Sequence, residues 1–206
     1  MRPKEHWEQV YASRAANAVS WYQAHADRSL SLIRATGVGR NASIIDVGGG
    51  ASTLAEDLLA EGYTDVTVLD ISGAAIAAAK ARLGERALEV RWIEADITAI
   101  NLPRRCIDVW HDRAVFHFLT VSEDRMTYIS AILHAVRPGG HVIIATFAED
   151  GPTKCSGLPV VRYSPEELHA EFGEAFSLHR CEREEHVTPT GAVQRFVYCH
   201  LRKSVA

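Results

Sequence analysis

Short apolar runs alternate along the chain with segments of helical periodicity. The pattern predicts strands over 43–47, 65–70, 89–95, 106–111 and 140–147, and helices over 53–62, 73–83, 123–137 and 165–173. Such alternation, with short turns between the segments, is typical of an α/β protein with a doubly wound, mostly parallel sheet. We therefore expect one domain over residues 1–206.

The two ends of the chain depart from this alternation. Residues 4–37 are amphipathic and predict two helices ahead of the first strand. Residues 176–188 and 193–202 predict two strands joined across Pro189-Thr190-Gly191, as in an antiparallel hairpin. With this C-terminal antiparallel hairpin the predicted sheet has seven strands.

Two helix starts carry a local signal. Ser164-Pro165-Glu166-Glu167 combines an N-cap residue, a proline at the first helical position and a capping-box acid. Thr53-x-x-Glu56 has the spacing of a second capping box. We expect a helix to begin at each of these places.

A glycine turn follows the first predicted strand. Gly48, Gly49 and Gly50 come directly after a buried run and directly before a helix start. Glycine has no Cβ to block a ligand from the backbone, and the first turn of a helix offers free N–H groups. A tight strand-to-helix connection would use the same glycines, so the turn alone leaves both interpretations open.

Asp70 favours a ligand at this turn. It ends the second strand, twenty residues beyond Gly50, where a carboxylate can accept hydrogen bonds from both hydroxyls of a ribose. A dinucleotide site would have a third glycine at position 53, which is a threonine here. Glu56 also places negative charge where a pyrophosphate would bind. The pattern therefore favours an adenosine-bearing ligand other than a dinucleotide.

Composition narrows the function classes. The chain has 206 residues, of which 47% are hydrophobic and 23% charged, and a net charge of −4, which gives no general attraction to nucleic acid. The N-terminal sequence lacks the apolar core of a signal peptide, and no apolar run approaches the roughly twenty residues that span a bilayer. We expect a cytoplasmic protein with no membrane and no nucleic-acid partner.

The four cysteines do not indicate a metal site. None belongs to a C-x-x-C pair, so neither structural zinc nor a disulfide framework is predicted, and we expect no metal. Most of them suit small core positions. Cys155 lies in a loop-like segment, where an inert thiol is expected unless the loop closes over a ligand.

These features together resemble the class I S-adenosylmethionine-dependent methyltransferases, from about Trp7 to Lys203. The run Asp46-Val47-Gly48-Gly49-Gly50 resembles their first motif, Asp70 their second-strand acid, and Asp96 the acid near the adenine. A turn-capping carboxylate is the alternative for Asp96. The resemblance implies S-adenosylmethionine as cofactor, S-adenosylhomocysteine as product, and these cofactor-binding residues: Trp7, Tyr11, Asp46, Gly48, Gly49, Gly50, Ser52, Asp70, Ile71, Asp96, Ile97 and His111.

The fourth predicted strand gives a more specific resemblance. The segment from Asp108 to Leu119 resembles the Asp-Arg segment of thiopurine methyltransferase-like enzymes. It is also similar to small protein-lysine methyltransferases, whose segment reads Asp-Lys-Gly. Because this chain has Arg113 in place of that lysine and lacks the glycine, the resemblance implies a small-molecule acceptor ahead of a protein lysine.

His111, Asp112 and Arg113 are the predicted catalytic residues, because they follow the strand that faces the methyl group in this fold. Arg113 can hold an oxyanion bidentately, and Asp112 can orient His111 or accept a proton. A structural Asp112–Arg113 ion pair is the alternative. His117 is a second candidate base and substrate contact. The alternative is that His117, which lies between two phenylalanines, is a core residue.

Aromatic residues near the N-terminus complete the predicted site. Trp7 and Tyr11 are four residues apart on one helical face, and either pack on the sheet or form a lid. Trp21 is a further substrate-binding candidate. We thus divide the domain into an N-terminal helical lid (1–40), a cofactor-binding core (41–147), and a loop, helix and closing hairpin (148–206).

The sequence therefore predicts methyl transfer to a small polar or anionic acceptor by in-line displacement. Such a reaction depends mainly on alignment of the nucleophile with the methyl carbon. Two alternatives remain: a protein-lysine N-methyltransferase, and a non-catalytic partner that binds the cofactor and stabilises another subunit.

Overall fold

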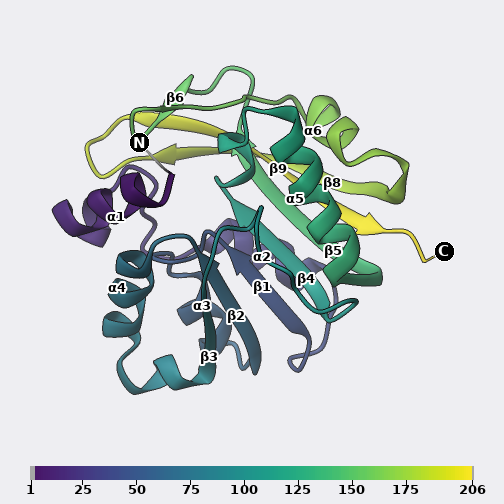
Figure 1. The fold of residues 1–206 in the computed structure, drawn as a ribbon, viewed down its shortest axis with the longest axis horizontal. Coiled ribbons are helices and arrows are strands. Elements are labelled where there is room, and N and C mark those ends of the chain that lie inside the picture. The colour runs from purple at the N-terminus through teal and green to yellow at the C-terminus, as the bar shows by residue number, and fades with distance from the viewer. Residues whose placement is uncertain (1–2, 206) are drawn as a thin grey trace.

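The computed structural model describes residues 3–205 and contains a seven-stranded sheet in the order β3-β2-β1-β4-β5-β9-β8 (Figure 1). The pairs among β1 to β5 are parallel, whereas β9 pairs antiparallel with both β5 and β8. The predicted fold class is confirmed. The strands are β1 (Ser43–Val47), β2 (Asp65–Asp70), β3 (Val90–Glu94), β4 (Ile107–Arg113), β5 (Val136–Phe147), β8 (Phe176–Val187) and β9 (Val193–Lys203).

Helices cover both faces of the sheet, and β1 is buried along its whole length. That burial explains why the strand reads as an uninterrupted apolar run. One core lies between the sheet and α5 and α6, and the other between the sheet and α2 and α3 (Figure 1). The helices are α1 (Pro3–Ser13), α2 (Asp27–Ala35), α3 (Leu54–Ala60), α4 (Gly73–Leu83), α5 (Ser122–Ala135) and α6 (Pro165–Phe172), with short 3-10 turns at Ala16–Ala18, Gly84–Glu89, Phe116–Phe118 and Gly173–Ala175.

The two predicted capping boxes have different outcomes. The box at the start of α6 is confirmed, because the Ser164 hydroxyl accepts from the Glu167 N–H and the Glu167 carboxylate accepts from the Ser164 N–H. The box at Thr53 is wrong: the Thr53 hydroxyl donates to the carbonyl of Gln23, 3.3 Å away, and caps nothing. Ser52 instead accepts from the Leu54 N–H at 3.1 Å.

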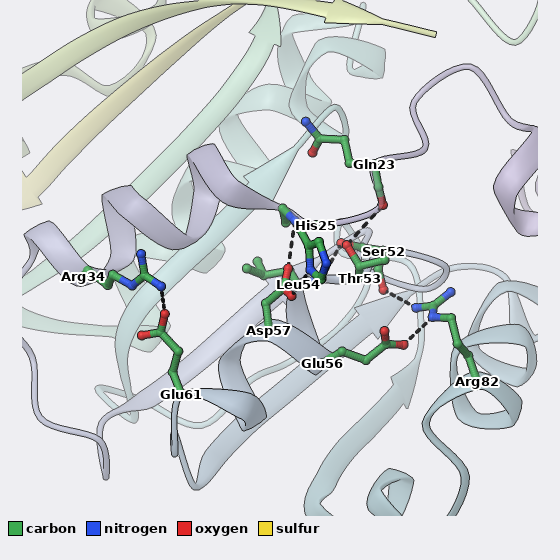
Figure 2. A network of polar contacts seen from close by, with 11 residues as sticks. Gln23, His25, Arg34, Ser52, Thr53, Leu54, Glu56, Asp57, Glu61 and Arg82 are labelled. Atoms are coloured by element: carbon green, nitrogen blue, oxygen red, sulfur yellow. Dashed lines mark hydrogen bonds and ion pairs between the residues drawn. The ribbon is translucent and has the colours of Figure 1, made fainter. Parts of the chain in front are cut away.

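Tertiary contacts account for that failure, as Figure 2 shows. Glu56 forms an ion pair with Arg82 of α4, so its carboxylate is not available to the helix start. Arg82 also donates to the carbonyls of Ala51 and Ser52, at 3.2 and 2.6 Å. The guanidinium of Arg82, which comes from α4, therefore fixes the turn before α3.

A second group of contacts in Figure 2 ties α3 to the segment before α2. One oxygen of Asp57 lies 2.8 Å from the His25 ring, and the other accepts from the Ala26 N–H at 2.8 Å. Glu61 pairs with Arg34 of α2. The chain leading from Trp21 into α2 is thus fastened to α3.

The predicted loop after β5 contains a short antiparallel pair of strands, β6 (Lys154–Cys155) and β7 (Leu158–Pro159), which the sequence did not reveal. Strand β4 also extends to Arg113, two residues beyond the predicted end. No helix within residues 3–205 is long and apolar enough to cross a membrane.

Candidate active site

A cavity of about 360 Å³ opens at the carboxyl ends of the parallel strands. This edge of an open α/β sheet is where ligands usually bind. Residues at and just after the carboxyl ends of β1, β2, β3 and β4 form its floor, while α1, the segment around Trp21 and the β6–β7 pair contribute the opposite walls. The floor consists of Val47, Gly48, Leu69, Asp70, Ile71, Ala95, Asp96, Ile97, Thr98, Arg113, Ala114 and Val115.

Asp70 lies on the cavity floor, at the end of β2. Its two carboxylate oxygens accept from the Gly50 N–H at 2.9 Å and the Ser72 N–H at 2.8 Å. Burial raises the pKa of Asp70 to about 6, although these two hydrogen bonds oppose the shift. The carboxylate is held in place by the backbone and still faces the cavity.

The geometry of the glycine turn explains two of its residues. Gly48 has φ of +72°, and a Cβ there would lie 2.0 Å from Val115. A Cβ on Gly50 would lie 2.6 Å from the Asp70 carboxylate. The turn therefore needs glycine so that the backbone can reach the acid of the next strand.

Asp96 caps a turn and also lies at the cavity. One of its oxygens accepts from the Thr98 N–H at 2.9 Å and from the Thr98 hydroxyl at 2.7 Å, which is a turn-capping arrangement. The residue nevertheless lines the cavity, beside Ile97 and across from Ile71 on the neighbouring strand end. The two isoleucines and the acid thus share one end of the cavity with Asp70.

Asp46 and His111 are neighbours on adjacent strands. They are register partners in the β1–β4 pair, and their side chains meet with Asp46 Oδ1 2.7 Å from His111 Nδ1. The other ring nitrogen of His111 lies 2.8 Å from the Ser29 hydroxyl of α2. With both nitrogens engaged, the imidazole orients Asp46 and has no nitrogen facing a substrate.

A smaller hollow of about 40 Å³ adjoins these two residues. Asp46, Gly49, Ser52 and His111 line it, and it shares Tyr11, Trp21, Gly48 and Arg113 with the larger cavity. Asp46 Oδ2 is buried and has no hydrogen-bond partner within residues 3–205. A buried carboxylate oxygen without a partner is an acceptor available to a ligand.

Asp112 is separated from its two sequence neighbours by strand geometry. The prediction placed all three residues after the strand, but they lie within β4, where successive side chains alternate between faces. Asp112 therefore points to the α5 side, where it accepts from Tyr128 and from the N–H groups of Val115 and Phe116. It forms no ion pair with Arg113 and does not line the cavity.

Arg113 lies on the cavity side of β4 with its guanidinium engaged. It donates to the Tyr198 hydroxyl at 2.8 Å, to the Trp21 carbonyl at 3.1 Å and to Glu184 at 3.5 Å. Its guanidinium carbon also lies 4.3 Å from the centre of the Phe196 ring. These contacts fasten the Trp21 segment to the C-terminal hairpin.

His117 is a core residue, as the alternative interpretation held. It is fully buried against Phe118 and Phe147, with ring centroids 4.5 and 4.8 Å away. Burial lowers its pKa to about 3. It is not among the residues that line the cavity.

Helix α1 covers the cavity with aromatic side chains. The Trp7 ring contacts those of Trp21 and Phe118 edge-on, at 5.6 and 5.2 Å, and the Tyr11 hydroxyl accepts from the Trp21 indole N–H at 3.2 Å. All four residues line the cavity. Trp7 and Tyr11 therefore occupy the position that a lid over the ligand requires.

Two charged side chains of α1, Glu8 and Lys4, hold the helix in this position. The Glu8 carboxylate accepts from the N–H groups of Gly73 and Ala74, at 2.6 and 3.3 Å, at the start of α4. Lys4 pairs with Glu94 at 2.6 Å. A carboxylate at a helix N-terminus is favoured by the helix dipole.

Several residues at the site were absent from the sequence-based set. Phe118 and Leu158 line the cavity, and Ser29 and Glu8 position parts of it. Cys155 lines it as well, and burial raises the pKa of its thiol to about 12. Only Cys155 carried a signal, its place in a loop, because the other contacts depend on how distant segments meet.

Known proteins share sequence or fold with this chain. Residues 44–140 match a family described as "Methyltransferase domain". The eEF1A lysine and N-terminal methyltransferase of Mus musculus is 22% identical over 151 residues, covering 70% of this chain and 21% of the relative. The chain thus spans about a fifth of that protein's length.

Two further proteins are similar over larger shares of their own length. An uncharacterized methyltransferase of Mycobacterium tuberculosis is 33% identical over 115 residues, covering 56% of this chain and 54% of the relative. The N-methyltransferase NodS of Bradyrhizobium japonicum, solved with S-adenosylhomocysteine, has a TM-score of 0.71 and 18% identity, covering 95% of this chain and 97% of NodS. At that identity the likeness to NodS shows the fold.

Proposed function

We propose that this chain, whose residues 44–140 match a methyltransferase domain, belongs to the class I, S-adenosylmethionine-dependent methyltransferases and transfers a methyl group from S-adenosylmethionine to a small-molecule acceptor. The observation that supports the proposal most directly is the meeting of Asp46, Asp70 and Asp96 around two adjoining hollows at one sheet edge. The glycine turn runs between the first two of these acids.

The residues present fit the cofactor. Asp70 faces the cavity with a carboxylate that suits ribose hydroxyls, and Ile71 and Ile97 offer apolar surfaces for an adenine. Asp46 Oδ2, buried and without a partner, suits an ammonium group. A methyl donor with adenosine at one end and an amino acid at the other matches this order of groups.

When bound, S-adenosylmethionine would supply an electrophilic methyl carbon on its sulfonium, so that a bond from the acceptor to this carbon could form in line as the C–S bond breaks and S-adenosylhomocysteine leaves. The chain's own residues bind, orient and exclude water. Asp70 and Asp46 would hold the two ends of the donor, and Trp7, Tyr11 and Trp21 would shield it from solvent. Alignment of this kind is the main contribution that such a reaction needs from a protein.

We infer that the acceptor has an apolar body. Beyond the cofactor-binding floor, Trp21, Phe118, Leu119, Leu158 and Pro159 form apolar walls, and His6, Thr120 and Asp124 add polar groups. The argument for an anionic acceptor relied on Arg113, whose guanidinium is committed to Tyr198, Trp21 and Glu184. An acceptor with an apolar body and a polar nucleophilic atom therefore fits these walls better than an anionic one, since Asp124 is the charged residue beside them.

The first test is calorimetric titration with S-adenosylhomocysteine. We expect micromolar binding to the unmodified chain and no response to NADH. Absence of heat at micromolar protein would remove the cofactor assignment and the proposal with it.

The second test is a screen for turnover with a labelled methyl donor. Small thiols, phenols, aromatic amines and carboxylic acids are compared with lysine-containing peptides. We expect label to reach apolar small molecules first. Transfer to peptides alone would favour a protein-lysine methyltransferase, the activity named for the Mus musculus relative. Cofactor binding with no transfer to any acceptor would favour a non-catalytic partner.

A further inference from the structure

The C-terminal hairpin contains a pair of thiols away from the cavity. Cys181 of β8 and Cys199 of β9 are register partners, and their Sγ atoms lie 2.9 Å apart. Both thiols pack into the core beneath α6, and the Cys199 Sγ also lies 3.8 Å from the carbonyl of Pro165. Neither residue lines the cavity.

We propose that Cys181 and Cys199 are a site of reversible oxidation, forming a cross-strand disulfide by exchange with a low-molecular-weight disulfide. The backbone already has suitable geometry. Directly opposed residues in an antiparallel pair have Cα atoms about 4.5 or 5.5 Å apart, within the range of about 4.4–6.8 Å that disulfides use. Their side chains also lie on the same face of the sheet.

The two thiols differ in access and acidity, and the difference sets the order of reaction. Cys181 is partly exposed, whereas Cys199 is fully buried. The hydrogen bond from the Cys199 thiol lowers the pKa of Cys181, and the same contact raises the pKa of Cys199. Cys181 is therefore the attacking thiol, because the thiolate is the nucleophile.

The exchange balances in two steps. The Cys181 thiolate attacks one sulfur of the small disulfide, that S–S bond breaks, and one small thiol leaves after taking up a proton. Cys199 then loses its proton and attacks the Cys181 sulfur of the mixed disulfide, releasing the second small thiol. The protein loses two hydrogens, and the small disulfide is reduced to two thiols.

The test uses glutathione disulfide as the probe. Cys106 is partly exposed, so all variants carry Cys106→Ser, which leaves three cysteines. After exchange, the protein is denatured and alkylated, and its mass is measured by mass spectrometry. We expect one alkylated cysteine in place of three, with no glutathione attached, and full recovery of all three after dithiothreitol.

Two variants assign the roles. With Cys199→Ser, glutathione should remain attached to Cys181, because no second thiol resolves the adduct. With Cys181→Ser, Cys199 should stay unmodified in the folded protein. The proposal is wrong if the parent protein keeps three reactive thiols, if it stops at the glutathione adduct, or if Cys199 reacts equally well without Cys181.

Thermal unfolding provides an independent readout. The cross-link would close the chain between positions 181 and 199, so the oxidised protein should melt roughly 5 °C or more above the reduced one. Dithiothreitol should abolish the difference. An unchanged melting temperature in a sample whose disulfide is confirmed by mass would show that the link strains the hairpin, against the geometry argued above.

Discussion

At the scale of single residues, Arg113 shows how neighbours decide a side chain's role. Its guanidinium joins the Trp21 carbonyl, the Tyr198 hydroxyl and Glu184, and its side chain is only 10% exposed. Glu184 is equally enclosed, at 13%. A buried ion pair of this kind is costly to break on one side, because the remaining charge has no partner.

Replacement of Arg113 by alanine should therefore lower stability as well as activity. We expect a loss of about 3–5 kcal/mol in the free energy of unfolding, measured by urea denaturation. Adding Glu184→Gln to Arg113→Ala should recover part of the loss, since it removes the unpaired charge. Unchanged stability with impaired turnover would instead make Arg113 a substrate contact.

Asp70 should matter both for ligand binding and for the glycine turn, because its two oxygens accept from Gly50 and Ser72. We expect Asp70→Asn to weaken S-adenosylhomocysteine binding by roughly 10- to 100-fold, as the loss of hydrogen bonds to a charged acceptor implies. Calorimetric titration measures the change. Asp65→Asn is the matched control, because Asp65 lies at the other end of β2 and does not line either hollow. Equal losses in both variants would contradict the assignment.

At the scale of elements, a side chain of α1 binds the N-terminus of α4. Glu8 of α1 accepts from the first N–H groups of α4, and this places Trp7 and Tyr11 over the cavity. The start of α4 has no acid of its own in the first turn. The carboxylate that complements the dipole of α4 therefore comes from another helix.

Glu8→Gln should loosen α1 over the cavity. Loss of the charge removes about 0.3–1 kcal/mol of dipole stabilisation, so we expect faster amide hydrogen exchange across 3–13 and a few-fold weaker binding of S-adenosylhomocysteine. Gln9→Ala is the control, since it alters an exposed side chain on the same helix. If exchange in α1 does not change, Glu8 does not hold the lid.

At the scale of the whole molecule, burial shifts titratable groups in opposing directions. It lowers the pKa of His117 to about 3 and that of His200 to about 4, and it raises the pKa values of Asp70 and Asp112 to about 6. As pH falls below 6.5, these histidines take up protons in the unfolded chain but not in the folded state, so the fold loses stability. The two acids act in the opposite sense, because the folded state protonates first.

A single substitution should expose one of these contributions. The stability that His117 gives the fold is complete above pH 6.5 and is lost as pH falls towards 3. The His117→Phe variant lacks this loss. Its free energy of unfolding, relative to that of the parent, should therefore rise by about 1.4 kcal/mol for each pH unit as the pH falls from 6 to 4. Urea denaturation across this range measures the gap. A gap independent of pH would show that His117 titrates normally.

Local signals were sufficient where the physics is local. The glycine turn before α3, the capping box at Ser164 and the apolar run of β1 all depend on residues close in sequence, and each has the predicted form. Thr53 failed because Arg82, from another helix, took the partner that its capping box needed. The β6–β7 pair was missed because strands of two residues leave no periodicity to detect.

The order of apolar and polar positions by itself determined the sheet and the helices that connect its strands. It also placed Asp46, Asp70 and Asp96 at strand ends, because backbone periodicity and turn chemistry act over short stretches. Only the tertiary structure decided which of these side chains share a space. Alternation along β4 sent Asp112 into the core and Arg113 to the hairpin, and packing buried His117. A side chain's role depends on the groups that distant segments bring to it, and those contacts form only when the chain is folded.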